Sequence, residues 1–129
     1  MRKMKNMDNN FIAIHHTSYI VADIDRSKHF YHTILGLDID DSRPNFSFDG
    51  LWLNINTQQQ IHLICVENPD STDRPEHGGR DRHTAFRVKD LSLVTLHLDK
   101  HQIAYTISKS GRKALFCRDP DGNTLEIME

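Results

Sequence analysis

Three histidines and one glutamate are the residues of this sequence best suited to chemistry: His16, His62, His83 and Glu126. Imidazole nitrogens and carboxylate oxygens bind divalent Zn, Ni, Co, Fe or Mn. No cysteine accompanies the four, whereas closed structural zinc sites usually contain thiolate ligands. The chain has nine histidines in 129 residues, so these three need a reason to be grouped.

An internal repeat relates the four residues. HTSYIVAD at 16–23 has the same frame as HTAFRVKD at 83–90, with valine five positions and aspartate seven positions after the histidine. A second match aligns His62 with Glu126, which follow the first histidine of their copy by 46 and 43 residues. A unit of about 50 residues is too small to bury a stable core alone, so we expect the two copies to pack together. One rule thus places all four residues, which favours a metal site over unrelated polar residues on strands.

Each copy is predicted to form one strand, one helix and three further strands. In the first copy, β-branched and aromatic residues predict a strand over 12–21, and Asp23 or Asp25 caps a helix over 26–35. The further strands of this copy are expected over 37–40, 46–55 and 60–66. In the second copy a strand over 82–88 precedes a helix capped by Asp90, and strands are expected over 104–108, 112–117 and 123–128.

These elements divide the sequence into four parts within one structural domain. They are a disordered lead-in (1–11), a first module (12–66), a linker (67–81) and a second module (82–129). The linker carries two prolines, two glycines and many charges, which is typical of a connecting segment.

The alternation of side chains along the strands predicts where the four residues point. In the last strand Glu126 shares a face with Thr124 and Met128, whereas Leu125 and Ile127 share the other face. The apolar face is expected to pack on the helices. The four residues then point to the opposite face, which two cooperating modules could enclose.

Composition excludes several classes of function. A formal net charge of -2 gives no basic field for nucleic acid, and no apolar run is long enough to cross a membrane. The N-terminal residues lack the apolar stretch of a signal peptide. Cys65 and Cys117 lie singly in apolar runs and are interpreted as buried thiols of a cytoplasmic protein. We therefore expect a cytoplasmic protein that acts on a small molecule.

Several motifs follow one another between residues 12 and 129: His16-x4-Val21-x-Asp23, Phe30-Tyr31, Leu35-Gly36-Leu37, Ile61-His62-Leu63, HTAFRV at 83–88 and Asp119-Pro-Asp-Gly-Asn-Thr-Leu-Glu126. In this order they resemble the vicinal oxygen chelate superfamily. That superfamily includes glyoxalase I, bleomycin-resistance proteins, fosfomycin-resistance thiol transferases and extradiol dioxygenases. The resemblance covers almost the whole chain, but it selects no subfamily.

The resemblance implies an α+β fold of two tandem βαβββ modules, which form a cupped, barrel-like mixed sheet with helices outside and a divalent metal ion within. It also implies a homodimer, in which one site takes His16 and His62 from one chain and His83 and Glu126 from the other. In such a site the metal chelates vicinal oxygens of a small substrate and stabilises a developing oxyanion.

One departure from the glyoxalase I pattern bears on the chemistry. That pattern has glutamate where this chain has His62, so Glu126 would be the only carboxylate base, and His62 is either a fourth ligand or a base beside the metal. His16, His83 and Glu126 resemble the ligand triad of fosfomycin thiol transferases and extradiol dioxygenases. We expect a metal-dependent lyase, isomerase or thiol transferase, with or without a thiol cosubstrate. The alternatives are a ferrous extradiol dioxygenase and a non-catalytic binding protein of the bleomycin-resistance type.

Five further residues are candidates for substrate binding: Arg87, Arg112, Arg118, Tyr105 and Trp52. The three arginines would pair with an anionic substrate such as a carboxylate or phosphonate. The six remaining histidines lack a repeated frame and are expected to be incidental surface residues: His15, His29, His32, His77, His97 and His101.

Overall fold

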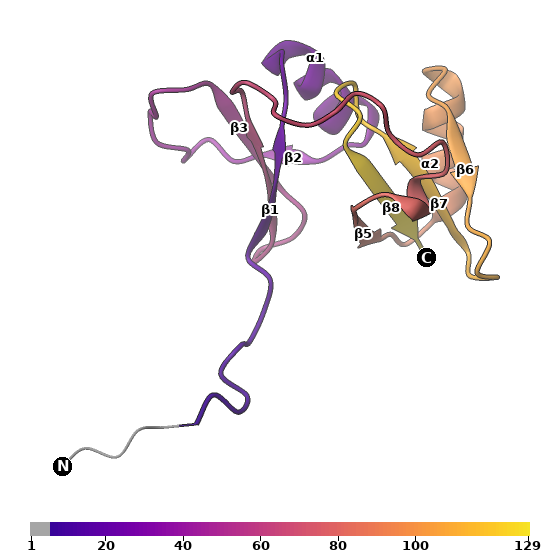
Figure 1. Ribbon diagram of the computed structural model, residues 1–129, viewed down its shortest axis with the longest axis horizontal. Coiled ribbons are helices and arrows are strands. Elements are labelled where there is room, and N and C mark those ends of the chain that lie inside the picture. The colour runs from indigo at the N-terminus through magenta and orange to yellow at the C-terminus, as the bar shows by residue number, and fades with distance from the viewer. Residues whose placement is uncertain (1–5) are drawn as a thin grey trace.

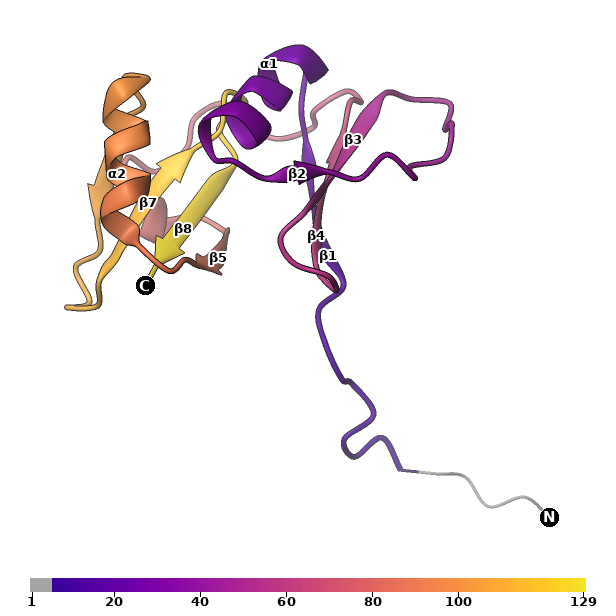
Figure 2. The same cartoon turned by 180° about the vertical axis from the view of Figure 1, so that it is seen from behind.

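Two four-stranded sheets of the same topology lie side by side in the computed structural model, which describes residues 6–129 (Figure 1). The expected lead-in falls partly on residues 1–5, which lie outside the described residues. Residues 6–15 precede the first strand and lead away from the two sheets (Figure 1, Figure 2). In the described part of the chain, no helix is long and apolar enough to cross a membrane.

The first module contains one helical segment and four strands. Its elements are β1 (His16–Ile20), α1 (Ile24–Lys28), η1 (His29–Ile34), β2 (Asp38–Ile39), β3 (Gly50–Asn54) and β4 (Gln60–Ile64). The predicted strand over 46–55 begins only at Gly50, because residues 41–49 form a loop.

The first helix differs from the prediction in both its start and its shape. Asp23 caps it by accepting a hydrogen bond from the Arg26 backbone at 3.2 Å. Its second half, η1, is π-helical, and the Leu35 amide accordingly bonds to the Phe30 carbonyl five residues back. This wider turn buries Phe30 and Tyr31 together.

The second module repeats the order of elements. It contains β5 (His83–Arg87), α2 (Leu91–Lys100), β6 (Tyr105–Ile107), β7 (Ala114–Arg118) and β8 (Thr124–Met128), and a short 3₁₀ turn, η2 (Gly78–Arg80), precedes it. Asp90 caps α2 through the amides of Ser92 and Leu93. The expected helix cap is therefore confirmed.

The two sheets have equivalent pairings, so the repeat in the sequence is a repeat in the structure. The orders are β1-β4-β3-β2 and β5-β8-β7-β6; in each sheet the first pair is parallel and the others are antiparallel. His62 lies opposite Ser18 on β1, and Glu126 lies opposite Ala85 on β5. The fold is α+β with a cupped mixed sheet that is not closed within the chain, as expected.

One hydrophobic core spans both modules and fixes which way the strands face. Ile61, Leu63, Leu125 and Ile127 are buried in it together with residues of both helical segments. The helix α2 covers one face of the second sheet, and α1 lies above the junction of the two sheets (Figure 2). His62 and Glu126 alternate with these core residues, so they belong to the opposite faces.

The loop Asp119–Asn123 holds the two modules together. The Asp119 carboxylate, 4% exposed, accepts from the amides of Asp121 and Asn123 at 2.9 Å and from the Tyr31 hydroxyl at 2.7 Å. The Asn123 side chain donates to Asp119 at 2.8 Å and to the Ile20 carbonyl at 3.0 Å. Asp119 and Asn123 of the tail motif therefore connect the two modules through hydrogen bonds.

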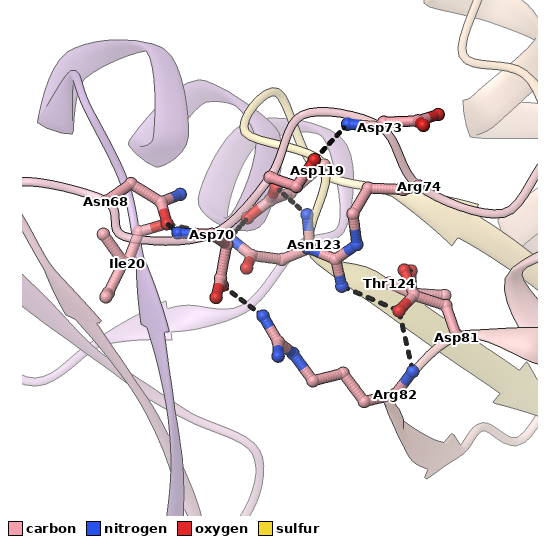
Figure 3. Close-up of polar contacts among 12 residues, drawn as sticks. Ile20, Asn68, Asp70, Asp73, Arg74, Asp81, Arg82, Asp119, Asn123 and Thr124 are labelled. Atoms are coloured by element: carbon pink, nitrogen blue, oxygen red, sulfur yellow. Dashed lines mark hydrogen bonds and ion pairs between the residues drawn. The ribbon is translucent and has the colours of Figure 1, made fainter.

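The linker is held by a network of arginines and aspartates (Figure 3). Asp81 accepts from Arg74 and from Arg118, each at 2.7 Å, and its side chain is only 8% exposed. The hydrogen bond from Arg74, followed by that from Arg118, holds the pKa of Asp81 well below its usual range. Arg82 pairs with Asp70 in a more exposed position.

Replacing Asp81 by asparagine should lower the free energy of unfolding by about 2 kcal/mol at pH 7, because two part-buried guanidiniums lose their anion. Asp70→Asn removes an exposed ion pair and should cost less than about 0.5 kcal/mol. Urea unfolding of both variants at one protein concentration measures the difference. Equal losses would contradict this view of the linker.

Candidate metal-binding site

The first two candidate ligands lie next to each other on one face of the first sheet. His16 opens β1, His62 is in the middle of β4, and their rings stack with centroids 3.9 Å apart. His16 is exposed and His62 is half-buried. Two imidazoles on neighbouring strands thus form half of a site.

Hydrogen bonds fix the orientation of His62. Gln60 donates through Nε2 to Asp40 at 2.6 Å and to Asn54 at 2.9 Å. Its Oε1 therefore accepts from Nε2 of His62, at 2.8 Å. This arrangement leaves Nδ1 of His62 as the nitrogen with a lone pair, and such neighbouring groups commonly orient metal-binding histidines.

His62 is held in the neutral form that a ligand requires. Burial, followed by the nearby imidazoles of His16 and His15, lowers the pKa of His62 to about 4. His15 also lies 2.8 Å from His16, Nδ1 to Nδ1, so one of the two rings donates to the other. The prediction that His15 is incidental missed this contact; its position beside His16 in the sequence was the only available signal.

The second two candidate ligands lie on the equivalent face of the second sheet. Nδ1 of His83 is 2.8 Å from the Asp81 carbonyl, which can only accept, so Nδ1 carries a proton. Nε2 of His83 lies 3.2 Å from Oε1 of Glu126. In neutral His83 this places a lone pair against a carboxylate oxygen, an arrangement that needs a proton or a metal cation between the two atoms.

Glu126 supplies a further sign that a cation belongs here. The residue is 3% exposed, and its Oε2 is buried without a hydrogen-bond partner. The nearest cation is Nη2 of Arg112 at 3.5 Å, on a side chain that is 58% exposed. A buried carboxylate oxygen without a donor is costly, so the residues present fit a bound metal ion.

The two halves do not meet within one chain. In the stretch from residue 6 to residue 129, no three histidine, cysteine, aspartate or glutamate side chains gather closely enough to hold a metal ion. Where β1 and β5, the facing edge strands of the two sheets, approach each other, the contact is between the Thr17 and Thr84 hydroxyls, which are 3.2 Å apart. The four candidate ligands are therefore two separate pairs.

The candidate arginines for substrate binding occupy three different settings. Arg112 lies beside Glu126, as described above. Arg87 is exposed at the end of β5, on the same face as His83. Arg118 instead bonds within the protein: its guanidinium donates to Asp81, to Thr124 and to the Gly122 and Pro75 carbonyls. Its surroundings are those of a residue that holds the linker.

The two aromatic candidates also differ. Trp52 is half-buried on β3 and stacks on His62, with ring centroids 4.4 Å apart. Tyr105 pairs with Cys117 in the register of β6 and β7 and packs against the core, on the opposite face from Glu126. Both cysteines are free, and burial raises the pKa of the Cys117 thiol to about 12, so it stays protonated.

The linker lies over the ligand-bearing face of the second sheet. His77 is 3.0 Å from the Thr106 hydroxyl, and its ring meets Phe116 edge to face at 5.1 Å. A Cβ on Gly78 would lie 2.6 Å from Thr124, so only glycine allows this close approach. His77 thus has a packing role that its place in the sequence did not indicate.

Comparison with known proteins assigns the family. A model of the Glyoxalase/Bleomycin resistance protein/Dioxygenase superfamily matches residues 13–127. The chain belongs to this superfamily. "Glyoxylase I 4" of Arabidopsis thaliana is 30% identical over 122 residues, which are 89% of this chain and 69% of the relative. "Metallothiol transferase FosB" of Staphylococcus epidermidis is 26% identical over 124 residues, which are 89% of this chain and 81% of the relative.

A solved structure supports the fold of this superfamily member. The crystal structure of a glyoxalase/dioxygenase from Nostoc punctiforme superposes with a TM-score of 0.73. It covers 98% of this chain and 97% of its own, at 22% identity. At that identity the likeness bears on the fold alone.

Proposed function

We propose that this protein is a divalent-metal-dependent enzyme of the glyoxalase and fosfomycin-resistance type, and that two copies complete each site. The observation that carries the proposal is the buried oxygen of Glu126 that accepts no hydrogen bond, beside His83 and on the face equivalent to that of His16 and His62. Each sheet offers two ligands, and a second copy would bring the complementary pair.

His16, His83 and Glu126 are the proposed ligands, with His62 as a fourth ligand or as a base beside the metal. A bound divalent ion would supply a Lewis acid that polarises vicinal oxygens of a small substrate. Glu126, the only carboxylate of the set, takes or returns the substrate proton. Arg112, exposed and next to Glu126, pairs with an anionic group of the substrate.

Complementation between two inactive variants tests whether the site is shared. His16→Ala and Glu126→Gln should each weaken metal binding so far that the homodimer loses its metal on dialysis. When the two variants are denatured together and refolded, half of the dimers are mixed, and each mixed dimer has one complete site. About a quarter of the wild-type metal content should therefore return.

Metal analysis after dialysis measures this recovery, and refolding each variant alone is the control. No recovery, while unmixed wild type refolds and binds metal, would show that each site lies within one chain. Wild type that binds no metal after reconstitution would contradict the proposed function itself.

An activity screen of the metal-loaded protein would identify the class of reaction. The likeness to a metallothiol transferase favours thiol addition to an epoxide, and the likeness to a glyoxylase favours isomerisation of a hemithioacetal. The dioxygenase alternative is tested by measuring oxygen uptake when the ferrous protein is given catechols. Tight binding of a small molecule that a chelator leaves unchanged would favour the binding-protein alternative instead.

A further inference from the structure

A row of stacked rings extends from the candidate ligands across the first sheet. The His16 and His62 rings lie 14° from parallel, and His62 and Trp52 lie 9° from parallel. Trp52 is the register partner of His62 on the neighbouring strand β3. The three rings form one continuous stack, and the edges of the rings line a surface over β1, β4 and β3.

The loop before β3 adds two more rings to this surface. Phe46 lies 6.3 Å from Trp52, and its ring stacks on Phe48 at 5.5 Å and 8°. The Arg43 guanidinium lies 4.9 Å from the centre of the Phe46 ring and 5.6 Å from that of Phe48. Such cation–π contacts hold the two rings in place.

The backbone is shaped to hold Arg43 under the loop. Its Nη2 donates to the Phe48 carbonyl at 2.9 Å. A Cβ on Gly50 would lie 2.7 Å from that nitrogen and 2.5 Å from the Leu63 carbonyl, so a side chain at position 50 would displace the arginine. The loop before β3 therefore has a conformation that specific contacts define.

The outer end of this surface is apolar and open. Phe46 is 47% exposed, although aromatic side chains gain most when they are covered. Arg43 forms no ion pair with a carboxylate of the described residues, so the loop presents an uncompensated positive charge behind its rings. A flat, electron-rich group complements both features.

We propose that Phe46 and Trp52 determine specificity, by holding a planar aromatic group of the substrate whose oxygen atoms point to His16 and His62. This inference rests on the proposed function, because the oxygen-binding end of the substrate needs the metal site. It narrows the substrate class to small anionic molecules with vicinal oxygens and an aryl substituent.

Trp52 is the only tryptophan of the chain, so its fluorescence reports binding at this surface. The metal-loaded protein is titrated with mandelate and with lactate, two hydroxy acids with the same vicinal oxygens that differ in phenyl against methyl. Mandelate should bind about tenfold more tightly. Phe46→Ala should reduce this preference to about twofold and leave the affinity for lactate unchanged, whereas Phe11→Ala, in the exposed N-terminal segment, should change neither.

Each other outcome overturns the inference in a recognisable way. Equal, metal-dependent binding of both acids would contradict the aromatic surface and leave the proposed function standing, as would a metal-loaded protein that binds neither acid. Absence of metal uptake would remove the proposed function and this inference together. A saturated analogue of mandelate, with cyclohexyl in place of phenyl, should bind like lactate; if it binds like mandelate, the surface selects for apolar bulk and not for an aromatic ring.

Discussion

Glu126→Gln should reduce metal affinity roughly 100-fold or more and abolish turnover, while the protein keeps its fold. The carboxylate is the only anionic ligand of the proposed set, and a neutral amide oxygen is a much weaker ligand for a divalent ion. The substitution changes neither shape nor size, and Oε2 has no hydrogen bond to lose. Metal titration by calorimetry, with circular dichroism to monitor the fold, measures both parts of the expectation.

Glu67→Gln provides the matched control, because the same chemical change then falls on an exposed linker carboxylate. It should leave metal affinity within about twofold of wild type. If Glu126→Gln bound metal as tightly as this control, Glu126 would not be a ligand. The pair His83 and Glu126 would then be a structural ion pair.

Asp119→Ala should lower the free energy of unfolding by about 3 kcal/mol. The carboxylate accepts from two backbone amides, the Asn123 side chain and the fully buried Tyr31 hydroxyl, all of which would lose their partner. Burial raises the pKa of Asp119. The side chain therefore stabilises the fold more through the hydrogen bonds that its oxygens accept than through its charge. Urea unfolding at a fixed protein concentration gives the loss.

Two further variants make this prediction sharper. Asp119→Asn keeps one acceptor oxygen and should cost about half as much as alanine. Asp41→Ala, on an exposed loop, should cost less than about 0.5 kcal/mol. A loss at Asp119 no greater than that at Asp41 would mean that the apolar core alone holds the two modules together.

The repeat made the topology predictable, because a strand, a helix and three strands had to bury the same apolar positions twice. Alternation then assigned the faces: Leu125 and Ile127 are in the core, and Glu126 between them is on the other side. These are local regularities that a single sequence carries. The sequence did not predict the loop over 41–49, because Phe46 and Phe48 alternate as residues of a strand do, whereas both pack on Arg43.

The groups that support the site depend on contacts between distant residues, which no spacing reveals. Gln60 orients His62 because Asp40, 20 residues earlier, takes its amide hydrogen. Arg118 is a substrate-binding candidate from the sequence, yet it bonds to a backbone carbonyl of the linker and to Asp81. Such roles follow from how the linker folds over the second sheet, and that path is set by packing.

The meeting of β1 and β5 at Thr17 and Thr84 has a consequence for solubility. Each sheet has two edges at which a foreign strand could add, and open edges seed aggregation. One edge of each sheet faces the other module at this contact. The outer edges are β2 and β6, which have only two and three residues and offer few free backbone groups. The arrangement therefore protects an unclosed sheet from strand addition.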